Sequence, residues 1–156
     1  MRPKFFEELH KQMLQNPDIF VLTGDLGYGG FDKIRNDYPN RFINCGASEQ
    51  AMLDIAVGLA LKGKVVFTYT ITSFYLRAAE TISLYLDHEQ IPVHMVGSGR
   101  DQDYKHDGYS HDCTPAQNYI HSLKISEHYP QQVEDVADIL AEVIRNEKPS
   151  FISLKR

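Results

Sequence analysis

Apolar positions along the chain alternate between two spacings. Short apolar runs, typical of strands buried on both faces, occur at 18–24, 41–45, 64–70, 91–98 and 151–155. Apolar residues at helical spacing predict helices at 3–14, 31–38, 49–62, 73–88 and 133–144. Since strands and helices alternate, the pattern predicts an α/β fold of three layers, a mostly parallel sheet with helices on both faces.

A single carboxylate stands where one of these strands meets its helix. Ser48 is suited to cap that helix. The side chains expected to share its buried face are Met52, Ile55, Ala56 and Leu59. Glu49 therefore falls in the first helical turn, at the carboxyl end of a strand, where open α/β sheets bind their ligands. An acidic residue there also complements the helix dipole, so the segment alone leaves a structural and a functional role open.

The stretch 99–113 is polar, contains glycine and follows neither a helical nor a strand period, so it predicts a long loop. Loops of this length inside compact domains are usually functional. Its potential metal ligands are His106, Asp107, His111, Asp112 and Cys113. Because their spacing matches none of the usual zinc patterns, we expect no metal ligands in this chain.

Composition narrows the class of protein. The 156 residues, 42% of them hydrophobic, carry a net charge of −5 and no clustered basic stretch, which argues against nucleic acid as a partner. The sequence has two cysteines, Cys45 and Cys113. This number predicts a protein of the reducing cytoplasm rather than one with a disulfide framework. No apolar run is long enough for a membrane span, and the charged N-terminus differs from a signal peptide. We expect one complete compact domain over residues 1–156.

Four segments contain motifs that resemble those of transketolases, in the same order and at the same spacing. They lie at 22–43, 41–60, 63–82 and 92–116. The resemblance covers essentially the whole chain but only one part of a transketolase, the domain that binds the aminopyrimidine ring of thiamine diphosphate. The Gly-Asp-Gly signature of the diphosphate-binding domain does not occur in the sequence, and we also expect the C-terminal transketolase domain to be absent.

The resemblance therefore implies a split enzyme. A second polypeptide would carry the diphosphate-binding domain and the ligands of a Mg²⁺ or Ca²⁺ ion. In this family the cofactor lies between domains of different subunits, and two such sites form around a two-fold axis. The implied assembly is a heterotetramer with two copies of each chain.

The same resemblance assigns residues to the cofactor. Glu49 would be the catalytic residue that shares a proton with ring atom N1′, a task that suits a carboxyl group in an apolar pocket. Phe74 falls where transketolases stack an aromatic ring on the pyrimidine, and Ile71 replaces a second phenylalanine. Arg77 matches a Phe-x-x-Arg-Ala pattern, and Asp25 matches an aspartate near the thiazolium ring and substrate. Each also has a structural alternative: Phe74 could be a core residue, Arg77 a surface residue, and Asp25 part of an Asx turn.

Residues Asp107 to His111 resemble the family's Asp-Gly-Pro-Thr/Ser-His loop. In transketolases the aspartate and the histidine of that loop contact substrate hydroxyls near the reacting carbon. Imidazole groups bind hydroxyls and carry protons, so we expect Asp107 and His111 to be catalytic and substrate-binding residues.

Two arginines match positions where transketolases clamp the substrate phosphate. They are Arg2 and Arg156, and a guanidinium group fits that role. The family's serine for the phosphate is replaced by Gly29, and a family histidine eight residues before Asp107 is replaced by Gly99. These departures leave the cofactor chemistry intact but put the usual sugar-phosphate substrate in doubt, which suggests an unusual sugar as acceptor.

The resulting hypothesis is a pyrimidine-binding subunit of a two-component, transketolase-like transferase. The enzyme would transfer a two-carbon ketol or acyl unit from a sugar or keto acid donor to an aldehyde or ketone. A subunit of a thiamine diphosphate-dependent 2-oxo acid decarboxylase is one alternative. A non-catalytic interaction domain that kept the fold is the other.

Overall fold

The computed structural model describes residues 1–155, within which six strands form one parallel sheet in the order β2-β1-β3-β4-β6-β5. The strands are β1 (Ile19–Thr23), β2 (Phe42–Asn44), β3 (Val65–Ile71), β4 (Val93–Ser98), β5 (Ser126–His128) and β6 (Ser150–Leu154). The order reverses between β1 and β3, and ligands of open α/β sheets bind at the carboxyl edge of such a reversal.

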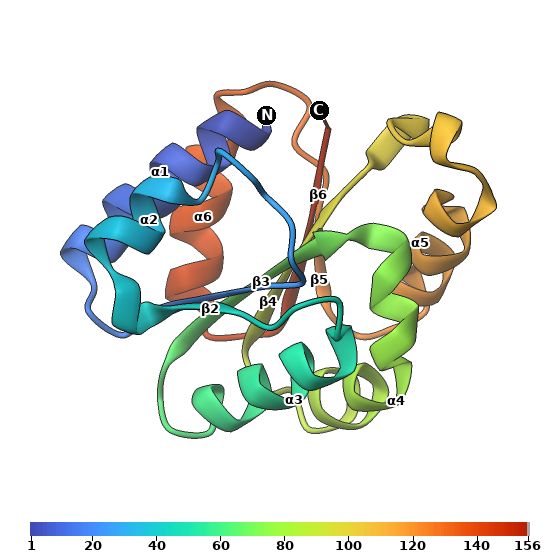
Figure 1. Cartoon of the computed structure of the whole chain (residues 1–156). Helices are drawn as coiled ribbons and strands as arrows, with labels where there is room; N and C mark the ends of the chain where they lie inside the picture. The colour runs from blue at the N-terminus through green and yellow to red at the C-terminus, as the bar shows by residue number, and fades with distance from the viewer. Residues whose placement is uncertain (156) are drawn as a thin grey trace.

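Helices cover both faces of the sheet, which confirms the three-layer α/β architecture (Figure 1). The α-helices are α1 (Arg2–Gln15), α2 (Asp32–Asp37), α3 (Glu49–Ala60), α4 (Ala79–Thr81), α5 (Thr114–His121) and α6 (Asp135–Asn146). Helices α1, α2 and α6 bury their apolar side chains against one face. Helices α3 and α5 and the segment around α4 cover the other face. Among residues 1–155, no helix has the length and apolar character that a membrane crossing requires.

Three parts of the predicted secondary structure need correction. Helix α5 and strand β5 were not predicted. The segment predicted as one helix at 73–88 begins as a 3₁₀ helix, η2 (Thr72–Ala78), and ends as a π-helix, η3 (Ile82–His88). Thr72 and Ser73 explain the tight turns, because their hydroxyls donate to the carbonyls of Ser98, at 3.0 Å, and Ser110, at 2.9 Å. The remaining short 3₁₀ turns are η1 (Pro39–Arg41), η4 (Arg100–Gln102), η5 (Lys105–Asp107) and η6 (Tyr109–His111).

The buried face of α3 differs from the predicted one. Its members are Glu49, Met52, Leu53, Ala56, Val57 and Ala60. Ile55, predicted to be buried, is 42% exposed, and Ser48 makes no capping hydrogen bond with its side chain. The apolar stripe therefore begins at the carboxylate itself, which turns Glu49 inward toward the sheet.

Glycines let the loop after β1 close tightly. Gly27 has φ of +82°, and a Cβ there would overlap the ring of Phe31. A Cβ on Gly30 would overlap the ring of Phe6 on α1. The loop therefore lies directly against aromatic side chains at the carboxyl edge of the sheet, where a bulkier residue would push it away.

His94 makes stability depend on pH. It is 2% exposed on β4, and its Nδ1 lies 2.9 Å from Oγ of Ser150 on β6. Burial, helped by the charge of His128, lowers the pKa of His94 to about 4. Since the unfolded chain binds a proton below about 6.5 and the native chain does not, this group should lower the free energy of unfolding by about 2 kcal/mol between pH 7.5 and pH 5.

Urea unfolding at the two pH values measures this effect. The His94→Gln variant should lose less stability than the wild type on acidification, by about that amount. His88, whose side chain is 79% exposed, provides the matched control His88→Gln. Equal losses in the wild type and in His94→Gln would contradict the assignment.

Candidate functional site

The carboxylate of Glu49 lies at the carboxyl edge of the sheet and is held from two sides. The residue is 1% exposed. Its Oε2 accepts a hydrogen bond from Nη1 of Arg77 at 2.7 Å, and its Oε1 accepts one from Oγ1 of Thr70 at 3.3 Å. A Cβ on Gly24 would lie 3.2 Å from Oε1, closer than ordinary van der Waals contact, so the glycine lets the chain directly after β1 lie close to the carboxylate. A buried anion is thus brought to the point where β1, β3 and α3 meet.

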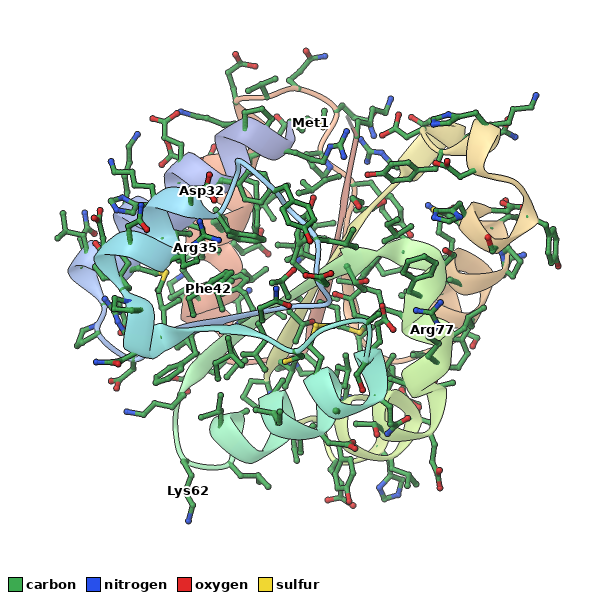
Figure 2. The ribbon with its side chains drawn as sticks, in the orientation of Figure 1. Met1, Asp32, Arg35, Phe42, Lys62 and Arg77 are labelled. Carbon is green, nitrogen blue, oxygen red and sulfur yellow. The ribbon has the colours of Figure 1, made fainter. Side chains whose placement is uncertain are left out.

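Arg77 connects this buried anion to the surface. Its side chain is 52% exposed, whereas that of Glu49 is 1% exposed. The guanidinium carbon lies 4.2 Å from the centre of the Phe74 ring, a cation–π contact that orients the arginine. Figure 2 labels Arg77 on the segment that follows β3. The contact with Glu49 is a charge-assisted hydrogen bond, which is stronger than the one from Thr70.

An aromatic ring, that of Phe74, is linked to the carboxylate through Arg77. Ile71, at the end of β3, is 4% exposed. Phe74 is half-buried, and its ring meets the ring of His111 edge-on at 5.2 Å. Nδ1 of His111 lies 3.0 Å from Oγ of Ser110. Since Ser110 also accepts from Ser73, the long loop is tied to η2, and the imidazole is kept against Phe74.

Asp25 occupies a constrained position next to Gly24. Its φ is +58°, a left-handed conformation that is uncommon for a residue other than glycine. Oδ1 accepts hydrogen bonds from Nδ2 of Asn44 at 2.9 Å and from the hydroxyl of Tyr28 at 3.1 Å. The backbone N–H of Asp25 donates to Oδ1 of Asn44 at 3.2 Å. These contacts are not those of an Asx turn, and they hold the carboxylate at the ends of β1 and β2.

Two other predicted site residues, Asp107 and Arg2, lie away from the carboxylate. Asp107 is exposed on the long loop, and its Oδ2 lies 3.3 Å from Nε2 of His106. Arg2 donates from Nη1 to the hydroxyl of Tyr104 at 2.7 Å. Arg156 lies outside the described residues. Within residues 1–155, no group of three or more His, Cys, Asp or Glu side chains is placed to hold a metal ion.

Sequence reasoning missed three contributors to the site: Gly24, Asn44 and Thr70. Thr70 is one of several polar residues in an apolar strand, and nothing in the linear sequence distinguishes it from Thr68. Asn44 carried a usable signal, because it is the last residue of its strand and strand ends form the ligand-binding edge.

Comparison with known proteins identifies the family. The family profile described as "Transketolase, pyrimidine binding domain" matches residues 1–156. The chain belongs to the transketolase family. The resemblance of the four sequence segments is thereby confirmed, and the α/β fold is the one that this family has.

Several relatives are themselves parts of transketolases. A putative transketolase C-terminal section from Methanocaldococcus jannaschii is 32% identical over 113 residues, which are 71% of this chain and 36% of that protein. One of the subunits of an apulose-4-phosphate transketolase from Phocaeicola vulgatus is 33% identical over 101 residues, 62% of this chain and 31% of that protein.

Solved structures agree with these relatives. A split gene transketolase, described as an inactive β4 tetramer, has a TM-score of 0.86 and 25% identity. The match covers 99% of this chain and 50% of that one. The chain therefore spans half or less of the length of each relative named here. Family members use thiamine diphosphate, and this chain has the fold of their pyrimidine-binding domain.

The ion pair at Glu49 should contribute to stability. Arg77→Met leaves a buried carboxylate with the weak contact from Thr70, so we expect the free energy of unfolding to fall by about 1–3 kcal/mol, toward the lower end because Arg77 is half exposed. Urea unfolding of the wild type, the single variants and Glu49→Gln/Arg77→Met forms a double-mutant cycle. The double variant should recover part of the loss. Strictly additive losses would show that the two side chains are not coupled.

Proposed function

We propose that this chain is the pyrimidine-binding subunit of a two-component, thiamine diphosphate-dependent transferase of the transketolase type. The enzyme transfers a two-carbon ketol or acyl unit to an aldehyde or ketone acceptor, including unusual sugars. The observation that carries the proposal is the buried Glu49 carboxylate at the carboxyl edge, paired with Arg77, which lies over the ring of Phe74. A single domain, residues 1–156, performs this role.

The residues at this edge fit the aminopyrimidine ring of the cofactor. Thiamine diphosphate, when bound, supplies the nucleophilic carbon, and the protein supplies orientation and a proton relay. The two carboxylate oxygens of Glu49 differ in a way that suits the relay. Oε2 is held strongly by Arg77, whereas Oε1 has only the 3.3 Å contact from Thr70, near the limit for a hydrogen bond. We therefore assign Oε1 to ring atom N1′ and assign Arg77 the task of holding the carboxylate in place.

The aromatic wall and the long loop complete the proposed site. Phe74 packs on the ring face, and Ile71 closes the pocket from β3. His111, kept against Phe74, binds a substrate hydroxyl or moves a proton at the reacting carbon. Asp25 faces the cofactor's second ring and the substrate. Asp107 reaches substrate hydroxyls from the exposed part of the loop.

We also propose that a second polypeptide is required. It carries the diphosphate-binding domain and the ligands for Mg²⁺ or Ca²⁺, and two copies of each chain assemble in the cytoplasm. Support comes from relatives described as one of a transketolase's subunits and as a split gene product. The active site then lies at the boundary between two different polypeptides.

Glu49→Gln tests the proton relay. In the complex reconstituted with the partner, transfer from donor to acceptor should fall at least about 100-fold, since an amide cannot relay the proton. Assembly, measured by size-exclusion chromatography with light scattering, should not change. Glu134→Gln replaces an exposed glutamate at the start of α6 and serves as the control. Unchanged turnover in Glu49→Gln would contradict the proton relay and favour the alternative of a non-catalytic interaction domain. Release of carbon dioxide without use of an acceptor would favour the decarboxylase.

Phe74→Leu tests the ring contact. Loss of stacking should raise the concentration of thiamine diphosphate needed for half-maximal activity by about 2–12-fold, which corresponds to about 0.5–1.5 kcal/mol. Phe74→Tyr keeps the ring and should behave like the wild type. If Phe74→Leu needs the same concentration of thiamine diphosphate for half-maximal activity as the wild type, Phe74 does not contact the cofactor.

A further inference from the structure

A cavity of about 200 Å³ lies at the amino edge of the sheet, at the opposite ends of the strands from Glu49. It is lined by the end of α3, the beginnings of β3 and β4 and the end of α6. Figure 2 labels Lys62 in the loop that enters this end of β3, whereas Arg77 follows the far end of the same strand. Since one buried water needs only about 10–15 Å³, the cavity has room for a small organic molecule.

The hydrogen bond between His94 and Ser150 fixes which nitrogen of the imidazole carries the proton. Ser150 is 1% exposed, and the Nδ1 of His94, at 2.9 Å, is the one hydrogen-bond partner of its hydroxyl within residues 1–155. If Nδ1 donated, the hydroxyl hydrogen of Ser150 would be buried without an acceptor, which is destabilising. The hydroxyl therefore donates to Nδ1. Since burial keeps this imidazole neutral, its single N–H is at Nε2.

This Nε2–H group has no acceptor in the described part of the chain. His94 is 2% exposed and lines the cavity, and its ring packs against that of Phe67 at 4.8 Å. Lys64 lines the same cavity. Its Nζ donates to Oδ1 of Asp18 at 2.6 Å, and an ammonium group has two further donors. A fixed N–H and a cation on one side of the cavity are complementary to a carboxylate.

The other charged residue of the lining has the opposite sign. Glu147 directly follows α6 and lines the cavity, and its carboxylate has no hydrogen bond or ion pair with any residue that the structure describes. Its φ is +48°, in the left-handed region that is uncommon for a residue other than glycine. A helix carries partial negative charge at its C-terminus. The end of α6 and the carboxylate together are therefore complementary to a cation.

Neither a metal ion nor a singly charged molecule satisfies both sides of the cavity. A nitrogen that carries a proton is not a metal ligand, and no group of three or more His, Cys, Asp or Glu side chains among residues 1–155 is placed to hold a metal. A simple anion leaves Glu147 without a counter-charge. A simple cation leaves the Nε2–H group of His94 without an acceptor. A molecule with both charges pairs with both groups.

We propose that the amino-edge cavity binds a small zwitterion of the α-amino acid class, whose carboxylate accepts from Nε2 of His94 and from Lys64 and whose ammonium group pairs with Glu147. The inference goes beyond the proposed transferase function and does not depend on it, because no residue that lines this cavity takes part in that function. The volume of the cavity restricts the ligand to amino acids with small side chains.

Calorimetric titration of the full chain with three probes at equal ionic strength tests the inference. L-alanine carries both charges, acetate only the negative one and methylammonium only the positive one. Alanine should bind with a dissociation constant at or below about 1 mM, since a ligand of this size reaches such affinity when both charged ends are paired. Acetate and methylammonium should each bind at least about 10-fold more weakly, because each lacks one charge-assisted contact. Acetate binding as tightly as alanine, or no binding of alanine below about 10 mM, would overturn the inference.

Two variants assign the contacts. Glu147→Gln should raise the dissociation constant for alanine by about 2–5-fold, a modest effect because the carboxylate is exposed, and should leave that for acetate unchanged. Glu134→Gln, the same change at the other end of α6, is the matched control and should bind alanine like the wild type. His94→Phe should weaken alanine and acetate alike, by about 3–10-fold. Unaltered alanine binding in Glu147→Gln would contradict the assignment of the ammonium group.

Nuclear magnetic resonance of the wild type gives a readout that does not require His94→Phe to fold. Two-bond ¹H–¹⁵N correlations should show the proton of His94 on Nε2 in the free protein. Addition of alanine or acetate should shift the Nε2 resonance, whereas methylammonium should not. A proton on Nδ1, or an Nε2 resonance that alanine leaves unchanged, would overturn the inference. Because none of these measurements uses enzyme activity, their outcome is separate from that of the transferase proposal.

Discussion

The arrangement of this chain depends on one buried anion. Taking a carboxylate out of water carries a penalty of several kcal/mol unless charge and hydrogen bonds compensate for it. Glu49 is compensated by Arg77, by Thr70 and by its place in the first turn of α3, where the helix dipole favours negative charge. Each of these requires a different element in place, so the site and the meeting point of β1, β3 and α3 form together.

The irregular segment after β3 follows from the same requirement. A regular α-helix would have satisfied its own backbone and left Thr72 and Ser73 without roles. Instead their hydroxyls bond to the ends of β4 and of the long loop. The resulting 3₁₀ turns bring Phe74 and Arg77 to the carboxylate and hold the loop that carries His111. Local backbone irregularity is thus concentrated where side chains converge, as is common at functional sites.

The two faces of β3 present neighbouring side chains to different parts of the structure. Thr70 points toward α3 and the carboxylate, and Tyr69 points toward α1 and the aromatic cluster. Asp25 stands between them, fixed by Asn44 and Tyr28. In the proposed function the cofactor ring occupies the side of Thr70 and the carboxylate. Family membership is consistent with that role.

Sequence alone determined the architecture and the central residue. Apolar strands alternating with helices require a parallel sheet covered on both faces, since either face must be buried, and the strand-to-helix junction placed Glu49 at the ligand-binding edge. Phe74 and Arg77 followed from their motif. Only the tertiary structure decided that the apolar stripe of α3 includes Glu49 and excludes Ile55, that Thr70 and Arg77 share the carboxylate, and that Arg2 meets Tyr104 from 102 positions away. Helical and strand periods report how one element meets the core, but they carry no information on which distant side chains meet across elements.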